Sequence, residues 1–196
     1  MLLAQKVGFG LRPEEDSNLG TVDALIESVT VKQPHVAMRS IKVADSKIEQ
    51  WPDQYDFTLE VRVKKARVMR KKIEALDADT EISEHDKAQQ RLSLKKNYEH
   101  HFTDRVCLAH QAVYGADPVR QRFIHFWMNH FTVGQKDDSH HYIGHLYKDT
   151  ISNGIDGNFE DLVYSVTRHP AMLTYLDNVY NVGEKSVAVK FNKGKH

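Results

Sequence analysis

Residues 59–76 read LEVRVKKARVMRKKIEAL, a stretch in which apolar side chains recur at every third or fourth position. This spacing places them on one face of an α-helix and does not fit the alternation of a half-buried β-strand. The apolar positions are Leu59, Val63, Ala66, Met69, Ile73 and Leu76. The stretch therefore predicts a long amphipathic helix with one face toward a core.

The charges around this helix come in two blocks. Residues 62–72 carry seven basic side chains, and residues 74–86 carry six acidic ones. A basic arm that binds nucleic acid would explain the first block, whereas two consecutive helices with solvated, mutually attractive faces would explain both. The 196-residue chain has 27 Lys plus Arg and 27 Asp plus Glu, so no overall field favours nucleic acid. The second interpretation is favoured, and no nucleic-acid partner is expected.

The remaining sequence predicts further helices and almost no strand. A second long helix is expected from about Glu84 to Tyr114, because Gly115 can end it in the left-handed conformation. Shorter helices are expected from Thr21 to Val29, from Pro118 through Phe131, from Ser139 to Ile151, from Asn158 onward and from Ala171 to Leu176, with at most one more near residues 44–50. Alternation is confined to Ser186–Phe191. The prediction is an all-α fold, an irregular multi-helix array of about seven helices in one domain, residues 1–196.

The composition excludes several classes of protein. No apolar run approaches the ~18–20 residues of a membrane span, and the N-terminal apolar run is too short for a secretory signal. A cytoplasmic protein is therefore expected. The single cysteine, Cys107, lies between Val106 and Leu108, which favours a buried free thiol.

Residues 123–133, FIHFWMNHFTV, combine four aromatic side chains with two histidines and an asparagine. On a helix the four aromatic residues share one broad face with His130, while His125 and Asn129 point elsewhere. His130 is then either a hydrogen-bonded core residue or a group for proton transfer or ligand binding. Trp127 and Asn129 are further candidates for binding. The predicted core comprises Phe123, Trp127, Phe131, Phe159, Leu162, Val166, Met172 and Leu176.

A second candidate site consists of Asp137, His141, His145 and Asp149, which are spaced by four. On one helix His141 and His145 would project together, as the histidines of HExxH metal sites do. The glutamate of that motif is absent, and zinc would need a third protein ligand that the sequence does not nominate. An apolar stripe lies almost opposite, so both histidines are expected to face solvent or another domain. They are the candidate ligands of a divalent metal ion.

Residues 168–178, RHPAMLTYLDN, contain a helix break at Pro170, one apolar helix, and Asp177 and Asn178 at its end. A carboxylate and an amide at a helix terminus can simply end the helix by binding backbone groups. They can equally present an acceptor and an amide to a pocket. Both interpretations stay open.

Four motifs in this order resemble a large bacterial family, domain of unknown function 1800. They are VGFG at residues 7–10, FWMNHFTV at residues 126–133, GNF at residues 157–159 and RHPAMLTYLDN at residues 168–178. The resemblance implies a helical bacterial protein with no established reaction, often encoded beside a protein that resembles the sulfatase and phosphatase superfamily. The later Asn-Glu-Asn and Ala-Arg-Glu motif of the family is absent, so we expect the N-terminal part of a longer protein. A polar site would draw His130, Asn129, Asp177 and Asn178 from this part.

Two functions fit these observations. The first is a binding or scaffold module that acts with a partner or with its missing C-terminal half, which predicts an exposed apolar surface for docking. The second is a hydrolytic or metal-assisted enzyme in which His130 carries a proton near Asp177 and Asn178. No complete catalytic constellation is present, so the first function is favoured.

Overall fold

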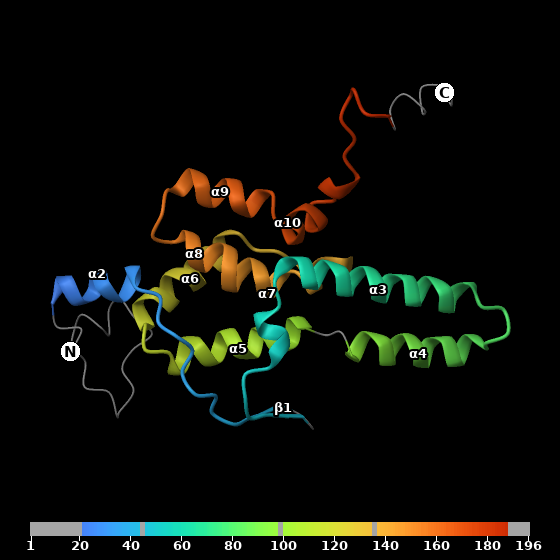
Figure 1. The fold of residues 1–196 in the computed structure, drawn as a ribbon, viewed down its shortest axis with the longest axis horizontal. Coiled ribbons are helices and arrows are strands. Elements are labelled where there is room, and N and C mark those ends of the chain that lie inside the picture. The colour runs from blue at the N-terminus through green and yellow to red at the C-terminus, as the bar shows by residue number, and fades with distance from the viewer. Residues whose placement is uncertain (1–20, 44–45, 98–99, 135–136, 188–196) are drawn as a thin grey trace.

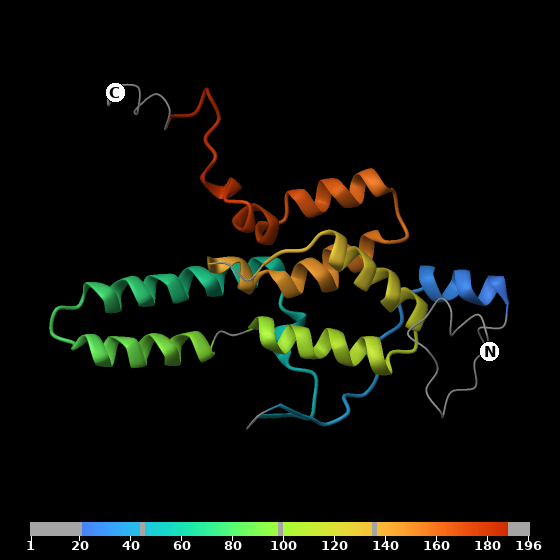
Figure 2. The same cartoon turned by 180° about the vertical axis from the view of Figure 1, so that it is seen from behind.

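The computed structural model describes residues 21–43, 46–97, 100–134 and 137–187. Helices dominate this part of the chain, which confirms the predicted all-α class (Figures 1 and 2). A two-stranded antiparallel hairpin, β1 (Ile41–Val43) and β2 (Ser46–Ile48), stands where a short helix near residues 44–50 was expected. That expectation is wrong, because Ile41 pairs with Ile48 across the hairpin. The strand expected over residues 186–191 lies mostly outside the described residues.

The stretch at residues 59–76 forms α3 (Leu59–Ala78), as its periodicity predicts. Thr58 caps it by accepting a hydrogen bond from the Val61 backbone N–H. The chain then returns antiparallel as α4 (Glu84–Asn97), and the two helices form a hairpin that projects from the rest of the described chain (Figure 1). Arg91 contacts Asp77 with an Nη2–Oδ1 distance of 2.5 Å. This pair joins the two helices, but Arg91 lies outside the basic block of residues 62–72, so the attraction predicted between the two charge blocks stays a prediction.

The long helix expected over residues 84–114 is described as α4 and α5 (His100–Tyr114), on either side of residues 98 and 99. Gly115 follows α5, and its N–H bonds the Gln111 carbonyl at 2.7 Å. The next helix, α6 (Pro118–His130), begins after Asp117. The Asp117 carboxylate does not cap α6; it accepts hydrogen bonds from the side-chain amide of Gln121 instead.

Residues 137–154 were expected to contain one regular helix from Ser139 to Ile151, but the backbone changes form several times. A 3-10 turn η2 (Asp137–His141) precedes α7 (Ile143–His145), a π-helical segment η3 (Leu146–Ile151) and α8 (Ser152–Gly154). Single π segments inside helices often accompany functional sites. The Leu146 and Ile151 side chains are fully buried, so this segment lies in the centre of the fold.

The other elements surround that central segment. They are α2 (Val22–Thr30), the 3-10 turn η1 (Asp53–Asp56), α9 (Phe159–Thr167), α10 (Pro170–Tyr175) and the 3-10 turn η4 (Asn178–Tyr180). Asn158 caps α9 by accepting a hydrogen bond from the Glu160 N–H at 2.7 Å, as its position predicts. In Figure 1, α9 lies along the central segment, with α10 following at its end.

The core confirms part of the predicted set. Leu162, Val166 and Met172 are buried, and Cys107 is a buried free thiol whose pKa burial raises to about 12. Trp127 and Phe131 are only partly buried against this core. The other three predicted core residues, Phe123, Phe159 and Leu176, are exposed. The prediction was wrong for them because α6 turns Gln121 and Ile124 inward and leaves much of its aromatic side outward.

A buried ion pair connects the layers around the central segment. The Arg62 guanidinium donates to both carboxylate oxygens of Asp104, with N–O distances of 2.6 and 3.0 Å, and both side chains are almost completely buried. It also donates to backbone carbonyls of Gln54, Tyr55 and Phe57. Such bidentate, fully bonded pairs specify geometry, and removal of one partner leaves an uncompensated buried charge.

Candidate functional site

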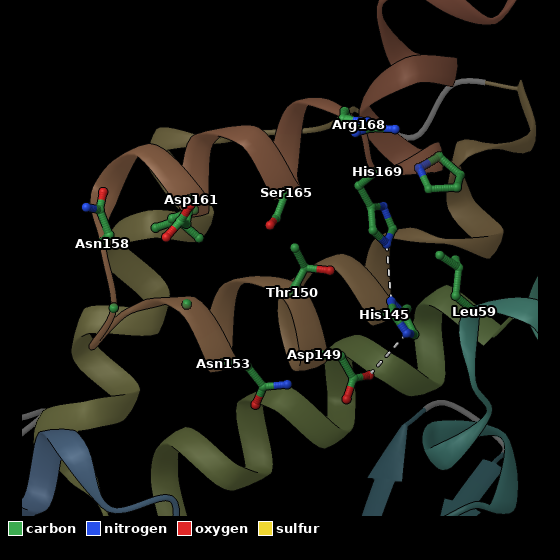
Figure 3. A pocket seen from close by; sticks show the side chains of 14 residues that line it. Leu59, His145, Asp149, Thr150, Asn153, Asn158, Asp161, Ser165, Arg168 and His169 are labelled. Atoms are coloured by element: carbon green, nitrogen blue, oxygen red, sulfur yellow. Dashed lines mark hydrogen bonds and ion pairs between the residues drawn. The ribbon is translucent and has the colours of Figure 1, made fainter.

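An open pocket of about 640 Å³ lies between α9 and the segment η3–α8 (Figure 3). Its size falls within the range of small-molecule sites. Apolar surface from residues such as Leu59, Leu162 and Pro170 lines it together with nine polar side chains: His145, Asp149, Thr150, Asn153, Asn158, Asp161, Ser165, Arg168 and His169. Figure 3 shows Ser165 and Thr150 facing one another from the two sides. The pocket therefore offers hydroxyls, amides, carboxylates and imidazoles to one ligand.

The two histidines of the pocket are positioned by helix ends. His145 is the last residue of α7, and Asp149 follows one turn later in η3. His169 is the N-cap of α10, and its Nδ1 accepts a hydrogen bond from the Ala171 backbone N–H at 3.1 Å. Pro170 occupies the first helical position, where its missing N–H costs nothing. Local capping therefore holds the His169 ring so that its other nitrogen, Nε2, points to His145.

His145 Nδ1 and His169 Nε2 are 3.2 Å apart. Because His169 Nδ1 accepts the Ala171 N–H, the network requires the His169 proton on Nε2, which then donates to His145 Nδ1. A neutral His145 must in turn carry its proton on Nε2. That atom lies 3.7 Å from Asp149 Oδ2. The hydrogen bond from the Ala171 N–H to His169 Nδ1 thus fixes the tautomers of both neutral rings.

Burial keeps both rings neutral. Burial, together with the neighbouring His145 and Arg62, lowers the pKa of His169 to about 3. Burial also lowers the pKa of His145, while the Asp149 carboxylate acts in the opposite direction. Asp149 itself contacts Lys148, with an Oδ2–Nζ distance of 3.5 Å. A neutral imidazole pair beside a carboxylate is therefore the charge state of this site near neutral pH.

A second feature is an aromatic face formed by Phe123, Phe126, Trp127 and His130 of α6, by Phe131 directly after α6, and by Phe159 of α9. The Trp127 ring contacts Phe126, Phe131 and Phe159, with ring centroids 5.0, 5.5 and 5.4 Å apart. Phe126 and Phe159 are 58% and 57% exposed. The cluster is thus continuous across two helices and open to solvent on its outer side.

The aromatic face contains two of the residues selected from the sequence, Trp127 and His130, and Asn129 is next to His130 in the chain. Trp127 lies inside the cluster, half-buried, while Asn129 and His130 are exposed at the end of α6. The His130 ring packs on Phe131 and Trp127, with centroids 4.9 and 5.4 Å apart. His130 is therefore not the buried core residue that one interpretation expected.

Asp177 and Asn178 lie at the turn between α10 and η4, and both are exposed. Asp177 has a positive φ of 58°, a left-handed conformation that Asp tolerates better than most residues. Asn178 Oδ1 accepts a hydrogen bond from the Asn181 side chain at 2.8 Å. These features fit the terminating role of the pair. A catalytic grouping of His130, Asp177 and Asn178 stays a prediction.

His141 and His145 do not share one regular helix, because η2 ends at His141 and α7 begins at Ile143. His141 is buried at 1% exposure, not turned to solvent as expected, and its ring lies 3.9 Å from that of His140. The structure instead brings His145 together with His169. No group of three or more His, Cys, Asp or Glu side chains among the described residues has the arrangement of a metal site. Metal binding by His141 and His145 remains a prediction.

Sequence reasoning missed His169 as a site residue. The available signal was its position directly before Pro170, in the motif at residues 168–178, where a polar side chain caps a helix. Its partner His145 is 24 residues away, and no local pattern links the two.

Comparison with known proteins gives one match. The family model described as "Protein of unknown function (DUF1800)" matches residues 2–192, in agreement with the resemblance seen in the four motifs. No curated protein and no solved structure matches the chain. Within the described residues, no helix combines the length and apolarity that crossing a membrane requires.

Proposed function

We propose that this chain, which belongs to the DUF1800 family of proteins of unknown function, is a protein-binding module whose aromatic face receives an amphipathic helix of a partner. The observation that carries the proposal is the exposure of the aromatic face. Phe123, Phe126 and Phe159 are 45%, 58% and 57% exposed although each could bury a large apolar area. Clustered aromatic side chains of this kind are characteristic of interface centres.

The spacing of the exposed residues supports a helix as the occupant. Phe123, Phe126 and His130 follow one another at positions i, i+3 and i+7 along α6. This is the stripe that packs against one more helix. Phe159 of α9 contacts Trp127 and widens the stripe to one side. A partner helix with an apolar stripe of its own would cover these rings.

The partner is expected to be a protein and not a nucleic acid. The net charge of the chain is zero, and aromatic rings rather than basic side chains mark the exposed face. Two sources of the helix are consistent with the family resemblance. One is a further segment of the same polypeptide, and the other is the neighbouring-gene protein that resembles the sulfatase and phosphatase superfamily.

Site-specific photo-crosslinking tests the proposal. A photoreactive phenylalanine analogue replaces Phe126 in the protein expressed in its own host, and a matched protein carries it at Leu92 of α4. Leu92 is 56% exposed, almost the same as Phe126, but lies on the projecting hairpin. Adducts are expected from position 126 only, and mass spectrometry should place the crosslinked peptide in an amphipathic helix.

Two crosslinking results would count against the proposed binding of a partner helix. Equal crosslinking from positions 126 and 92 would show that the face attracts proteins no better than any exposed apolar residue. Adducts that join two copies of this chain through position 126 would show that the aromatic face binds a second copy and not a different protein. Either result contradicts the proposal. Direct binding of the neighbouring-gene protein, weakened by Phe126→Ser, would identify the partner.

A further inference from the structure

The histidine pair makes His145 Nε2 a hydrogen-bond donor at the pocket. The alternative tautomer of His145 would place a proton on Nδ1, toward His169 Nε2 at 3.2 Å. His169 would then have to carry its proton on Nδ1, where the Ala171 N–H already points. That would bring two protons together in the contact between His169 Nδ1 and the Ala171 N–H. A neutral pair therefore has one arrangement, in which both rings carry their proton on Nε2. His145 is therefore a donor toward the pocket and not a base.

An acceptor lies beside this donor. Asp149 Oδ2 is 3.7 Å from His145 Nε2, which is too far for a good direct hydrogen bond. A hydroxyl group can accept from an N–H and donate to a carboxylate at the same time. A ligand hydroxyl oxygen on the pocket side of the two atoms, about 2.8 Å from each, would therefore satisfy both, as a bridging water would in its absence.

The other side chains of the pocket favour the same chemistry. Thr150 and Ser165 each donate and accept, and the Asn153 and Asn158 amides do so as well. The Arg168 guanidinium lies over the Tyr164 ring at 4.8 Å and donates to the Tyr164 hydroxyl. The lining also holds the carboxylates Asp149 and Asp161. An anionic ligand is therefore disfavoured, whereas a neutral ligand with several hydroxyls can match these donors and acceptors beside the apolar lining of Leu59, Leu162 and Pro170.

We propose that this pocket binds a neutral polyhydroxylated ligand of the saccharide class, with one ligand hydroxyl that accepts from His145 Nε2 and donates to Asp149 Oδ2. The volume of about 640 Å³ accommodates such a ligand. This site is independent of the aromatic face, because none of the rings of that face lines the pocket. Failure of one proposal therefore leaves the other standing.

The first test is direct binding. The protein is titrated with glucose, cellobiose and N,N′-diacetylchitobiose, with inorganic phosphate and Zn²⁺ as competing chemistries, by calorimetry. Saturable binding of at least one saccharide is expected, weakened by about tenfold or more in Asp149→Asn, since a neutral amide replaces the charged acceptor of the bridging hydroxyl. The control Glu74→Gln, an exposed carboxylate on α3, should bind like the wild type. Absence of saccharide binding overturns the proposal, and so does binding of phosphate or Zn²⁺ that Asp149→Asn weakens.

The second test reads the proton order itself. In ¹⁵N-histidine NMR spectra at neutral pH, His145 and His169 should both appear as neutral Nε2–H tautomers. Addition of the bound saccharide should shift the His145 Nε2 resonance and leave its tautomer unchanged. An Nδ1–H tautomer at His145, or a saccharide that binds without shifting His145, would overturn the assignment of His145 as the donor.

Discussion

Gly144 is the glycine, among those in the described residues, with the least room for a side chain. A Cβ atom at this position would lie 1.9 Å from Oδ2 of the buried Asp104. Asp104 cannot move aside without breaking its bonds to Arg62. The absence of a side chain at residue 144 is therefore a condition for the buried ion pair.

We expect Gly144→Ala to lower the free energy of unfolding by about 3 kcal/mol or more, because overpacking adds to the disruption of a buried ion pair. Chemical denaturation measures the change. Gly183→Ala is the matched control, since a Cβ there meets nothing within 4 Å. The control should stay within about 0.5 kcal/mol of wild type. A Gly144→Ala protein as stable as the control would show that Asp104 and α7 can separate at little cost.

At the scale of elements, α10 begins with a histidine that serves as cap and as hydrogen-bond partner at once. The folded state holds the pKa of His169 near 3, below its ordinary value of 6.5, because the ring is buried. The unfolded chain therefore binds more protons between about pH 6.5 and pH 3. Stability contributed by the neutral ring is present above that window and is lost as the pH falls through it.

The variant His169→Asn isolates this contribution. Asparagine can still accept the Ala171 N–H as an N-cap but does not titrate. The free energy of unfolding of the wild type minus that of the variant should fall as the pH is lowered below 6.5. The expected slope is up to about 1.4 kcal/mol per pH unit. Urea denaturation from pH 8 to pH 4 measures it. The comparison cancels groups that do not contact residue 169, such as buried Asp117, whose pKa burial raises. A difference independent of pH would contradict the buried neutral ring.

At the scale of the whole molecule, the inner and outer apolar residues of α9 differ in role. Leu162 is 3% exposed in the core, whereas Phe159 is 57% exposed on the aromatic face. Leu162→Ala should cost about 2–5 kcal/mol of stability, as cavity-forming substitutions do. Phe159→Ala should cost about 1 kcal/mol or less, the value of its ring contact with Trp127. Denaturation of both variants measures this contrast, and an equal loss would place Phe159 in the core.

The all-α class could be predicted because helix formation depends on contacts between residues three and four apart. The periodicity of residues 59–76 predicted α3, and Asn158 predicted the start of α9. The hairpin of β1 and β2 escaped prediction, since three-residue strands carry too little alternation to be read. The π segment η3 escaped it for a similar reason, because its sequence keeps an ordinary helical pattern.

The candidate site shows most clearly which features local sequence determines and which depend on tertiary structure. Local sequence determined that His169 caps α10 and that aromatic side chains line one side of α6, since capping and periodicity act within one or two turns. Only the tertiary structure decided that the aromatic side stays exposed and that His145 meets His169 instead of His141. Those outcomes depend on which helix packs where, and packing is settled by residues far apart in the chain.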